Sequence, residues 1–90
     1  GPCDFLITKG QEDNTILEFK LASNSKAKNS YKQLDAYVKS HDANNGILVF
    51  FYFNEKEKRL VENITRENSE YTYTTILINC GKQVSASNLK

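Results

Sequence analysis

The chain has 90 residues, of which 39% are hydrophobic and 26% are charged, a composition typical of one small folded domain. Twelve Lys and Arg stand against eleven Asp and Glu, so the net charge of +1 provides no global attraction to nucleic acid or membrane. The longest strongly apolar stretch, residues 47–53, is too short to span a bilayer, and no signal-peptide pattern opens the sequence. We therefore expect a cytoplasmic protein.

The expected domain covers residues 3–80. Gly1 and Pro2 are typical of the remnant left by cleavage of an expression tag, although Pro2 can equally be native. Residues 81–90 have little apolar surface to bury, so we expect a flexible tail there. Cys3 and Cys80 have neither CxxC spacing nor a paired His. Both cysteines are therefore expected to be free thiols.

The first segments of the chain predict a β-hairpin. Residues 3–9 alternate weakly between apolar and polar side chains, and after a turn-rich stretch a second apolar segment covers residues 15–22. Because side chains alternate across a strand, Glu18 and Lys20 share one face of this second strand, while Leu17 and Phe19 lie on the other. Two charged side chains therefore point to the same side.

A helix is expected next, at residues 31–41, with Ser30 as its N-cap and with Tyr31, Leu34 and Val38 at helical spacing. Residues 44–46, Asn-Asn-Gly, are expected to stop it. Residues 47–53 are continuously apolar, which predicts a central strand buried on both faces.

The remaining segments predict one more helix and one more strand. Asn54 followed by Glu57 resembles a capping box and opens an exposed helix that runs to about Glu67. Residues 71–79 are rich in Thr, Tyr and Ile and indicate a last strand. The order is therefore β-β-α-β-α-β, an α/β fold with a small mixed sheet of about four strands and one or two helices.

Three charged side chains carry the candidate chemistry. A hairpin can bring Asp4 close to Glu18, because neighbouring strands lie about 5 Å apart, and Lys20 shares a face with Glu18. Two carboxylates at that separation suit a hard cation such as Mg²⁺ or Mn²⁺, and the lysine can hold a water molecule and offset negative charge. The alternative for Glu18 and Lys20 is a solvent-facing ion pair that contributes less than about 1 kcal/mol.

The sequence resembles the PD-(D/E)xK nuclease superfamily over residues 2–53. Three segments in the same order carry the resemblance: Pro2-Cys3-Asp4-Phe5-Leu6-Ile7, Ile16-Leu17-Glu18-Phe19-Lys20-Leu21-Ala22, and Gln33-Leu34-Asp35-Ala36-Tyr37. The helix motif Gln-x-x-x-Tyr is similar to that of the RecB-like branch. The order of the three segments is far more specific than any one of them.

The resemblance implies a restriction-endonuclease-like core and a role for each matching residue. Asp4 and Glu18 would be metal ligands, with the carbonyl of Phe19 as a further ligand, and Lys20 would position the attacking water. Gln33 and Tyr37 lie one helical turn apart and would contact the substrate, although Tyr37 can equally be a core aromatic.

Further candidate residues follow the Glu-x-Lys strand. Lys26 and Lys28 lie in the next loop, where they would contact backbone phosphates without reading base sequence, unless the loop is simply solvated. His41 is interpreted as a residue favoured by the helix C-terminus and not as a catalytic base.

The chain departs from the family pattern because the helix and strand that normally precede the Asp strand are missing from it. An uncovered Asp strand would expose unpaired backbone groups. We therefore expect either self-association or an N-terminal segment of a larger protein that completes the fold.

These observations predict a Mg²⁺-dependent nuclease that hydrolyses phosphodiester bonds, with DNA favoured over RNA as the substrate. One alternative is a noncatalytic nucleic-acid-binding or protein-binding module that keeps the fold. Another is a plain interaction domain in which Glu18 and Lys20 are surface residues.

Overall fold

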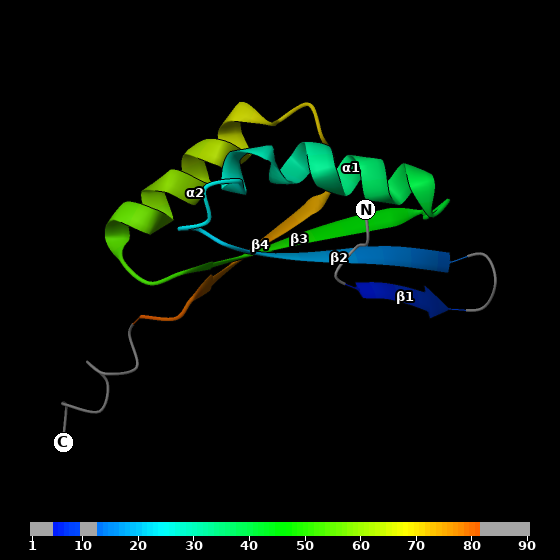
Figure 1. Ribbon diagram of the computed structural model, residues 1–90, viewed down its shortest axis with the longest axis horizontal. Helices are drawn as coiled ribbons and strands as arrows, with labels where there is room; N and C mark the ends of the chain where they lie inside the picture. The colour runs from blue at the N-terminus through cyan, green and yellow to red at the C-terminus, as the bar shows by residue number, and fades with distance from the viewer. Residues whose placement is uncertain (1–4, 10–12, 82–90) are drawn as a thin grey trace, which may run out of the picture.

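A computed structural model describes residues 5–9 and 13–81, and Figure 1 shows how their helices and strands are arranged. The chain forms one four-stranded mixed sheet with two helices, which confirms the predicted α/β fold class. The elements are β1 (Phe5–Lys9), β2 (Asp13–Leu21), the short 3-10 helix η1 (Ala27–Asn29), α1 (Ser30–Ser40), β3 (Asn45–Tyr52), α2 (Glu55–Glu67) and β4 (Thr74–Asn79). Several predictions fall on residues outside the described part of the chain: the tag remnant Gly1-Pro2, Cys3, Asp4 and most of the tail, residues 82–90.

The strands lie in the sheet in the order they have in the sequence, β1-β2-β3-β4. β1 and β2 form the predicted antiparallel hairpin, in which Phe5 lies opposite Leu17 and Ile7 lies opposite Thr15. β2 pairs in parallel with β3, and β3 pairs in parallel with β4. Parallel neighbours need a crossover connection, and α1 and α2 provide the two crossovers.

Both helices lie on the same face of the sheet (Figure 1). Crossovers between parallel strands are right-handed, and the steps from β2 to β3 and from β3 to β4 run in the same direction across the sheet. Each crossover therefore places its helix on the same side. α1 packs over β2 and β3, and α2 packs over β3 and β4.

The hydrophobic core lies between the helix layer and the sheet. Its most deeply buried apolar side chains come from both helices and from the two central strands: Ile16, Tyr31, Leu34, Leu48, Phe50 and Val61. Gly46 lies directly under α1, where a Cβ atom would be 3.0 Å from Val38 Cγ2 and 3.1 Å from Leu34 Cδ1. The close approach of the helix to β3 therefore depends on a glycine at this position.

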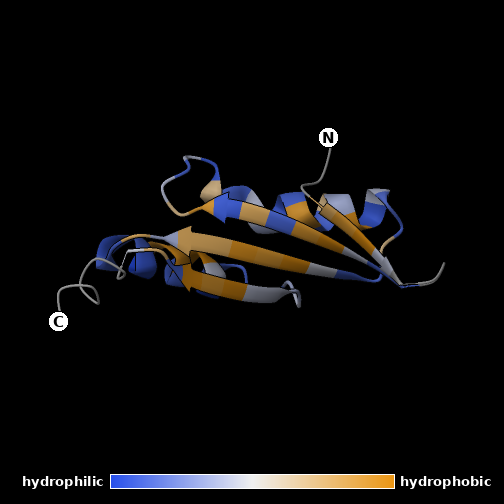
Figure 2. Cartoon of the chain, turned by 90° about the horizontal axis from the view of Figure 1, so that it is seen from below, coloured by the Kyte–Doolittle hydropathy of each residue, from blue (hydrophilic) through white to orange (hydrophobic). Residues whose placement is uncertain are grey.

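The other face of the sheet is not covered by either helix, and we call it the open face (Figure 2). Because side chains alternate along each strand, its apolar residues are Phe5, Ile7, Leu17, Phe19, Leu21, Ile47, Val49, Phe51, Ile76 and Ile78. Ring contacts between Phe5 and Phe19 (centroids 5.3 Å apart) and between Phe19 and Phe51 (5.8 Å) run across this face.

The open face corrects one prediction about residues 47–53. β3 is an interior strand, as expected, with neighbours on both sides. However, Ile47 and Phe51 are only partly buried, so the strand is not buried on both faces. The continuous apolar run reflects a helix layer on one side and the open face on the other.

The start of α1 differs from the prediction by one residue. Ser30 was expected to be the N-cap, but it is the first helical residue, and Asn29 occupies the cap position. The hydroxyl of Ser30 donates a 2.6 Å hydrogen bond to the carbonyl of Ala27. The preceding η1 turn therefore runs directly into α1, and Ser30 closes that turn instead of capping the helix.

The end of α1 lies within one residue of the predicted end at His41, before the expected stop signal at residues 44–46. The helix ends at Ser40, and Asp42 adopts a left-handed conformation with φ of 54°. The amide of Ala43 donates to the carbonyl of Val38 at 2.8 Å, and the amide of Asp42 donates to the carbonyl of Lys39 at 3.2 Å. This pair of bonds is a Schellman motif, which satisfies the last carbonyls of the helix.

The second helix begins with a variant of the predicted capping box, in which Glu57 reaches the residue before the N-cap. Asn54 accepts a 2.8 Å hydrogen bond from the amide of Glu57, and the Glu57 carboxylate accepts one from the amide of Phe53 at 2.8 Å. Val61 and Ile64 are buried, while the rest of the helix is largely exposed, as expected. Neither helix is of a length and apolar composition that could cross a membrane, within the described residues.

Candidate functional site

The Glu-x-Lys motif lies on β2, on the side that faces the helix layer. Alternation along the strand turns Glu18 and Lys20 toward α1, together with Ile16. Glu18 is only 4% exposed, and the Lys20 side chain is 14% exposed. The interpretation as a surface residue is therefore wrong for Glu18, while Lys20 is only partly buried.

Lys20 joins the strand to the helix above it. Its ammonium group lies 3.5 Å from a carboxylate oxygen of Glu18 and donates a 3.4 Å hydrogen bond to the side-chain oxygen of Gln33 on α1. Three of the predicted site residues therefore meet at one place. Both contacts are long for charge-assisted interactions, so the ammonium group is not held tightly by either partner.

Two other predicted residues lie near this place in different ways. Tyr37, one helical turn after Gln33, is 8% exposed and belongs to the hydrophobic core, which agrees with the core alternative. The side chain of Phe19 lies on the open face against Phe5 and Phe51. Any contribution of Phe19 to a metal site therefore comes from its backbone carbonyl.

The second predicted acid, Asp4, lies outside the described residues. Its neighbour Phe5 pairs with Leu17, which is the neighbour of Glu18. In residues 5–9 and 13–81 no three His, Cys, Asp or Glu side chains come together in a way that could hold a metal ion. The described donors are the Glu18 carboxylate, the Gln33 amide oxygen and backbone carbonyls, which are the hard oxygen ligands that Mg²⁺ and Mn²⁺ prefer.

A shallow hollow of about 420 Å³ lies beside Gln33 at the start of α1. Its lining residues are Lys26, Asn29, Lys32, Gln33 and Ala36. Of the two predicted phosphate contacts, Lys26 lines the hollow, whereas Lys28 is exposed and does not line it. Sequence reasoning missed Asn29 and Lys32, although the spacing of 29, 32, 33 and 36 places them on one helical stripe with Gln33.

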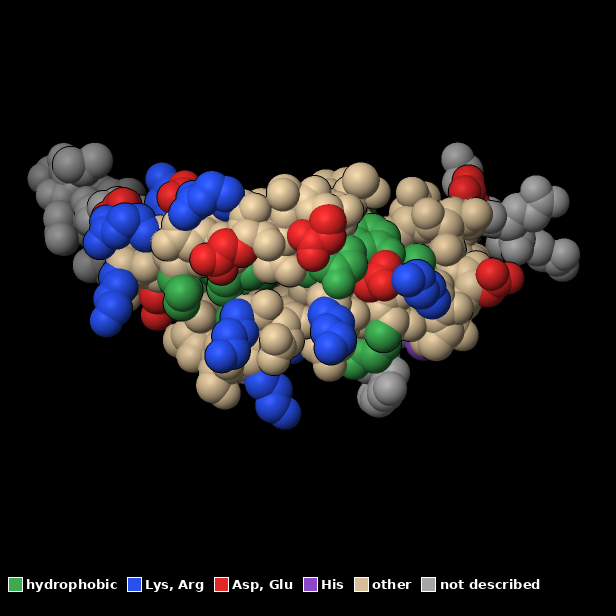
Figure 3. Space-filling model, turned by 90° about the horizontal axis from the view of Figure 1, so that it is seen from above, with side chains coloured by type: hydrophobic (Ala, Val, Ile, Leu, Met, Phe, Trp, Pro, Cys, Tyr) green, Lys and Arg blue, Asp and Glu red, His purple; other side chains and the backbone are tan. Residues whose placement is uncertain are grey.

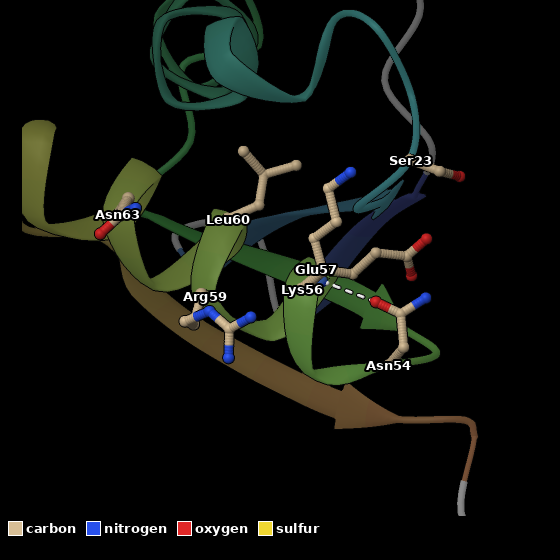
Figure 4. A pocket seen from close by; sticks show the side chains of 7 residues that line it. All are labelled: Ser23, Asn54, Lys56, Glu57, Arg59, Leu60 and Asn63. Carbon is tan, nitrogen blue, oxygen red and sulfur yellow. Dashed lines mark hydrogen bonds between the residues drawn. The ribbon is translucent and has the colours of Figure 1, made fainter.

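A larger hollow, of about 530 Å³, lies at the start of α2 and contains none of the predicted site residues (Figure 4). Its lining residues are Ser23, Asn54, Lys56, Glu57, Arg59, Leu60 and Asn63. The hydrogen bond from the Glu57 amide to Asn54 crosses one end of it. Asn54 and Glu57, which line this hollow, already form the N-terminal cap of α2. The volume of the hollow is therefore not evidence that it is a binding site.

A second titratable cluster lies on the opposite flank of α1. Asp35 accepts a 2.5 Å hydrogen bond from the hydroxyl of Tyr73 and pairs with Lys39 at 2.9 Å. The bond from Tyr73, followed by the bond from Lys39, lowers the pKa of Asp35. Burial, and then the bond to Asp35, raises the pKa of Tyr73 to about 12. Asp35 follows Gln33 by two residues, and two residues of an α-helix rotate by about 200°. The cluster and Gln33 therefore lie on opposite sides of α1.

His41 lies at the C-terminal end of α1, as predicted. Its Nδ1 is 3.0 Å from the carbonyl of Tyr37 and 3.2 Å from the hydroxyl of Ser40. A histidine that caps the last turn in this way stabilises the helix end. Of the two cysteines, Cys80 is a free thiol, as expected.

The comparisons with known proteins place these residues in a family. No curated protein and no solved structure matches the chain. Residues 1–55 match a family model described as "Domain of unknown function (DUF8371)". The matched region contains β1, β2, α1 and β3, and thus every candidate site residue. Because the match covers more than half of the 90 residues, the chain belongs to the DUF8371 family.

Proposed function

We propose that this chain is a metal-dependent nuclease of the PD-(D/E)xK type that hydrolyses phosphodiester bonds in DNA. The observation that carries the proposal is the burial of Glu18 beside Lys20, between β2 and α1. Replacement of a buried ion pair by apolar residues is often neutral or even stabilising, so such a pair is not explained by stability alone. The burial of two opposite charges in contact with each other therefore calls for a functional explanation.

Each described residue has a role that its position allows. The carboxylate of Glu18 would hold the cation together with Asp4 and the carbonyl of Phe19. A bound Mg²⁺ or Mn²⁺ would supply polarisation of the phosphoryl oxygen and acidification of a water molecule. The ammonium group of Lys20 would position that water and offset the charge that develops on the phosphoryl group.

Gln33 is a positioning residue in this proposal. Its side-chain oxygen accepts the hydrogen bond from Lys20. Gln33 also lines the hollow that contains Lys26 and Lys32, which we call the basic hollow. The hollow, with Lys26 and Lys32, supports an approach of the nucleic-acid backbone to the Glu18 and Lys20 pair from this side. The preference for DNA over RNA rests on the resemblance to the RecB-like branch.

The test is cleavage of a labelled DNA duplex and a labelled single strand, with and without Mg²⁺ or Mn²⁺. We expect Glu18→Gln and Lys20→Ala to lower the rate about 100-fold or more, while the exposed controls Glu62→Gln and Lys56→Ala keep it. Calorimetric titration with Mn²⁺ provides a second readout, which Glu18→Gln should weaken and Lys20→Ala should not. Cleavage that survives Glu18→Gln would contradict the proposal.

The basic hollow also favours a second candidate, a noncatalytic nucleic-acid-binding module. This candidate predicts salt-dependent binding of DNA or RNA without cleavage, and binding that is unchanged by Glu18→Gln. The same samples and a fluorescence anisotropy measurement distinguish the two candidates.

A further inference from the structure

The open face of the sheet has the composition of a protein interior. Its apolar residues come from all four strands, and its two charged positions, Lys9 and Asp13, pair with each other at one end of the sheet, near Thr15. Five of its side chains are 39–56% exposed: Phe5, Ile7, Leu21, Ile76 and Ile78. The outer side of the helix layer is different, because acidic and basic side chains are scattered over it (Figure 3).

The exposed apolar area is large for a chain of this size. An aromatic side chain has about 150–250 Å² of surface and an aliphatic one somewhat less, so the five side chains leave on the order of 400 Å² in water. The partly buried Leu17, Phe19, Ile47 and Phe51 add roughly 150 Å². A standard interface buries about 800 Å² per partner, of which roughly 60% is apolar. The exposed apolar area of the open face is therefore about as large as the apolar area that each partner buries in one such interface.

The width of the sheet limits what can cover this face. Four strands about 4.8 Å apart are roughly twice as wide as one helix, which has a diameter of about 10 Å. On the opposite face, two helices are needed, and Leu6 on β1 still remains 43% exposed. A single amphipathic helix would thus leave half of the open face in water, whereas a second sheet would cover all of it.

The chain itself offers one surface that fits this requirement. Outside the described residues, the sequence contains only a few small or isolated apolar residues: Pro2, Cys3, Val84, Ala86 and Leu89. Within the described part, the helix surfaces carry charges, and Leu60 is their large exposed apolar side chain. The face that matches the open face in size and lack of charge is the open face of another copy.

We propose that two copies of this chain pack open face to open face, as a two-fold symmetric sandwich of two sheets. The stacked sheets would lie about 10 Å apart, with the polar end at Asp13 and Thr15 forming part of the rim. Glu18 and Lys20 point away from this interface, toward α1. The inference therefore does not depend on the proposed nuclease activity, and each dimer would present its two sites on its outer sides.

The test is the mass of the full chain in solution, measured by sedimentation equilibrium at tens of micromolar. We expect twice the chain mass of 10.3 kDa for the unmodified protein. Phe5→Lys and Ile76→Lys, which place a charge on the open face at its two edge strands, should reduce the mass to that of one chain. Leu6→Lys is the matched control, because Leu6 neighbours Phe5 on β1 but points to the helix side, and it should remain a dimer.

Three outcomes would overturn the inference. A monomeric unmodified chain would mean that a second copy does not cover the open face. Open-ended aggregation would exclude a closed pair. Persistence of the dimer in Phe5→Lys and Ile76→Lys, or its loss in Leu6→Lys, would place the interface elsewhere. Circular dichroism on each variant checks that the sheet is intact, and the mass of the unmodified chain tests the inference even where a variant fails to fold.

Discussion

The hydroxyl of Tyr73 donates a 2.5 Å hydrogen bond to Asp35, and this bond joins the segment just before β4 to the helix α1. The two residues are 38 positions apart in the sequence, and their contact joins the segment that follows α2 to α1. Lys39 completes the cluster from the next turn of α1. We therefore expect the cluster of Asp35, Lys39 and Tyr73 to stabilise the folded state.

We expect Tyr73→Phe to lower the free energy of unfolding by about 1 kcal/mol at pH 7, because Asp35 loses a hydrogen bond. The pKa of Asp35 is lowered in the folded state, so its contribution is present above pH 3.8 and is lost as the pH falls through the folded value. The pKa of Tyr73 is raised, so its contribution is complete below pH 10.0 and is lost as the pH rises to about 12.

Urea unfolding of Tyr73→Phe, Asp35→Ala and the double variant across this pH range measures the coupling between the two side chains. The coupling energy should be near 1 kcal/mol at pH 7 and should shrink at both ends of the range. A coupling energy that stays the same from pH 3 to 12 would contradict the assignment.

The basic hollow gives a second prediction. If Lys26 and Lys32 contact phosphates, the double variant Lys26→Ala, Lys32→Ala should weaken DNA binding equally for all sequences. The slope of log K against log salt concentration should fall by about 1 for each lysine. The matched control removes two exposed cations from the larger hollow, Lys56→Ala with Arg59→Ala, and should leave the slope unchanged. Equal slopes in all three proteins would show that the hollow does not contact the backbone.

The Schellman motif at the end of α1 gives a third prediction. Asp42 has a φ of 54°, a region that favours glycine. We expect Asp42→Gly to raise the free energy of unfolding by about 0.5–1 kcal/mol, and Asp42→Ala to lower it by up to about 1 kcal/mol. The midpoint of urea unfolding measures both effects. A loss of stability in Asp42→Gly would mean that the aspartate side chain, and not the backbone conformation, stabilises the turn.

The shared face of Glu18 and Lys20 could be predicted because alternation along a strand is a local property. The resemblance placed Gln33 at the same site, and the structure brings its side chain to Lys20, because the helix that follows β2 has to return over that strand. By contrast, Asn29 and Lys32 were missed because a polar stripe on a helix has the same pattern whether or not it borders a site. Asp4 lies outside the described residues, so its placement beside Glu18 stays a prediction.

The helix boundaries were predicted to within about one residue, whereas strand ends differ by up to three residues, as at β4, which begins at Thr74 and not at residue 71. The start of α1 was misplaced because Ser30 hydrogen-bonds backward into η1, a contact that the cap preference of serine does not reveal. The open face was not predicted because the apolar run at residues 47–53 is compatible with one or two covered faces. The number of covered faces depends on the direction of the two crossovers, which is a property of the whole topology.

The order of the strands in the sheet also bears on how the molecule is built during translation. Every strand pairs with the strand that directly precedes it in the sequence, so no strand has to insert between two others. As the ribosome releases the chain from its N-terminus, the hairpin, then β3 and then β4 each find a finished template at the growing edge. Assembly can therefore proceed in a single direction, without a stage that waits for a distant segment.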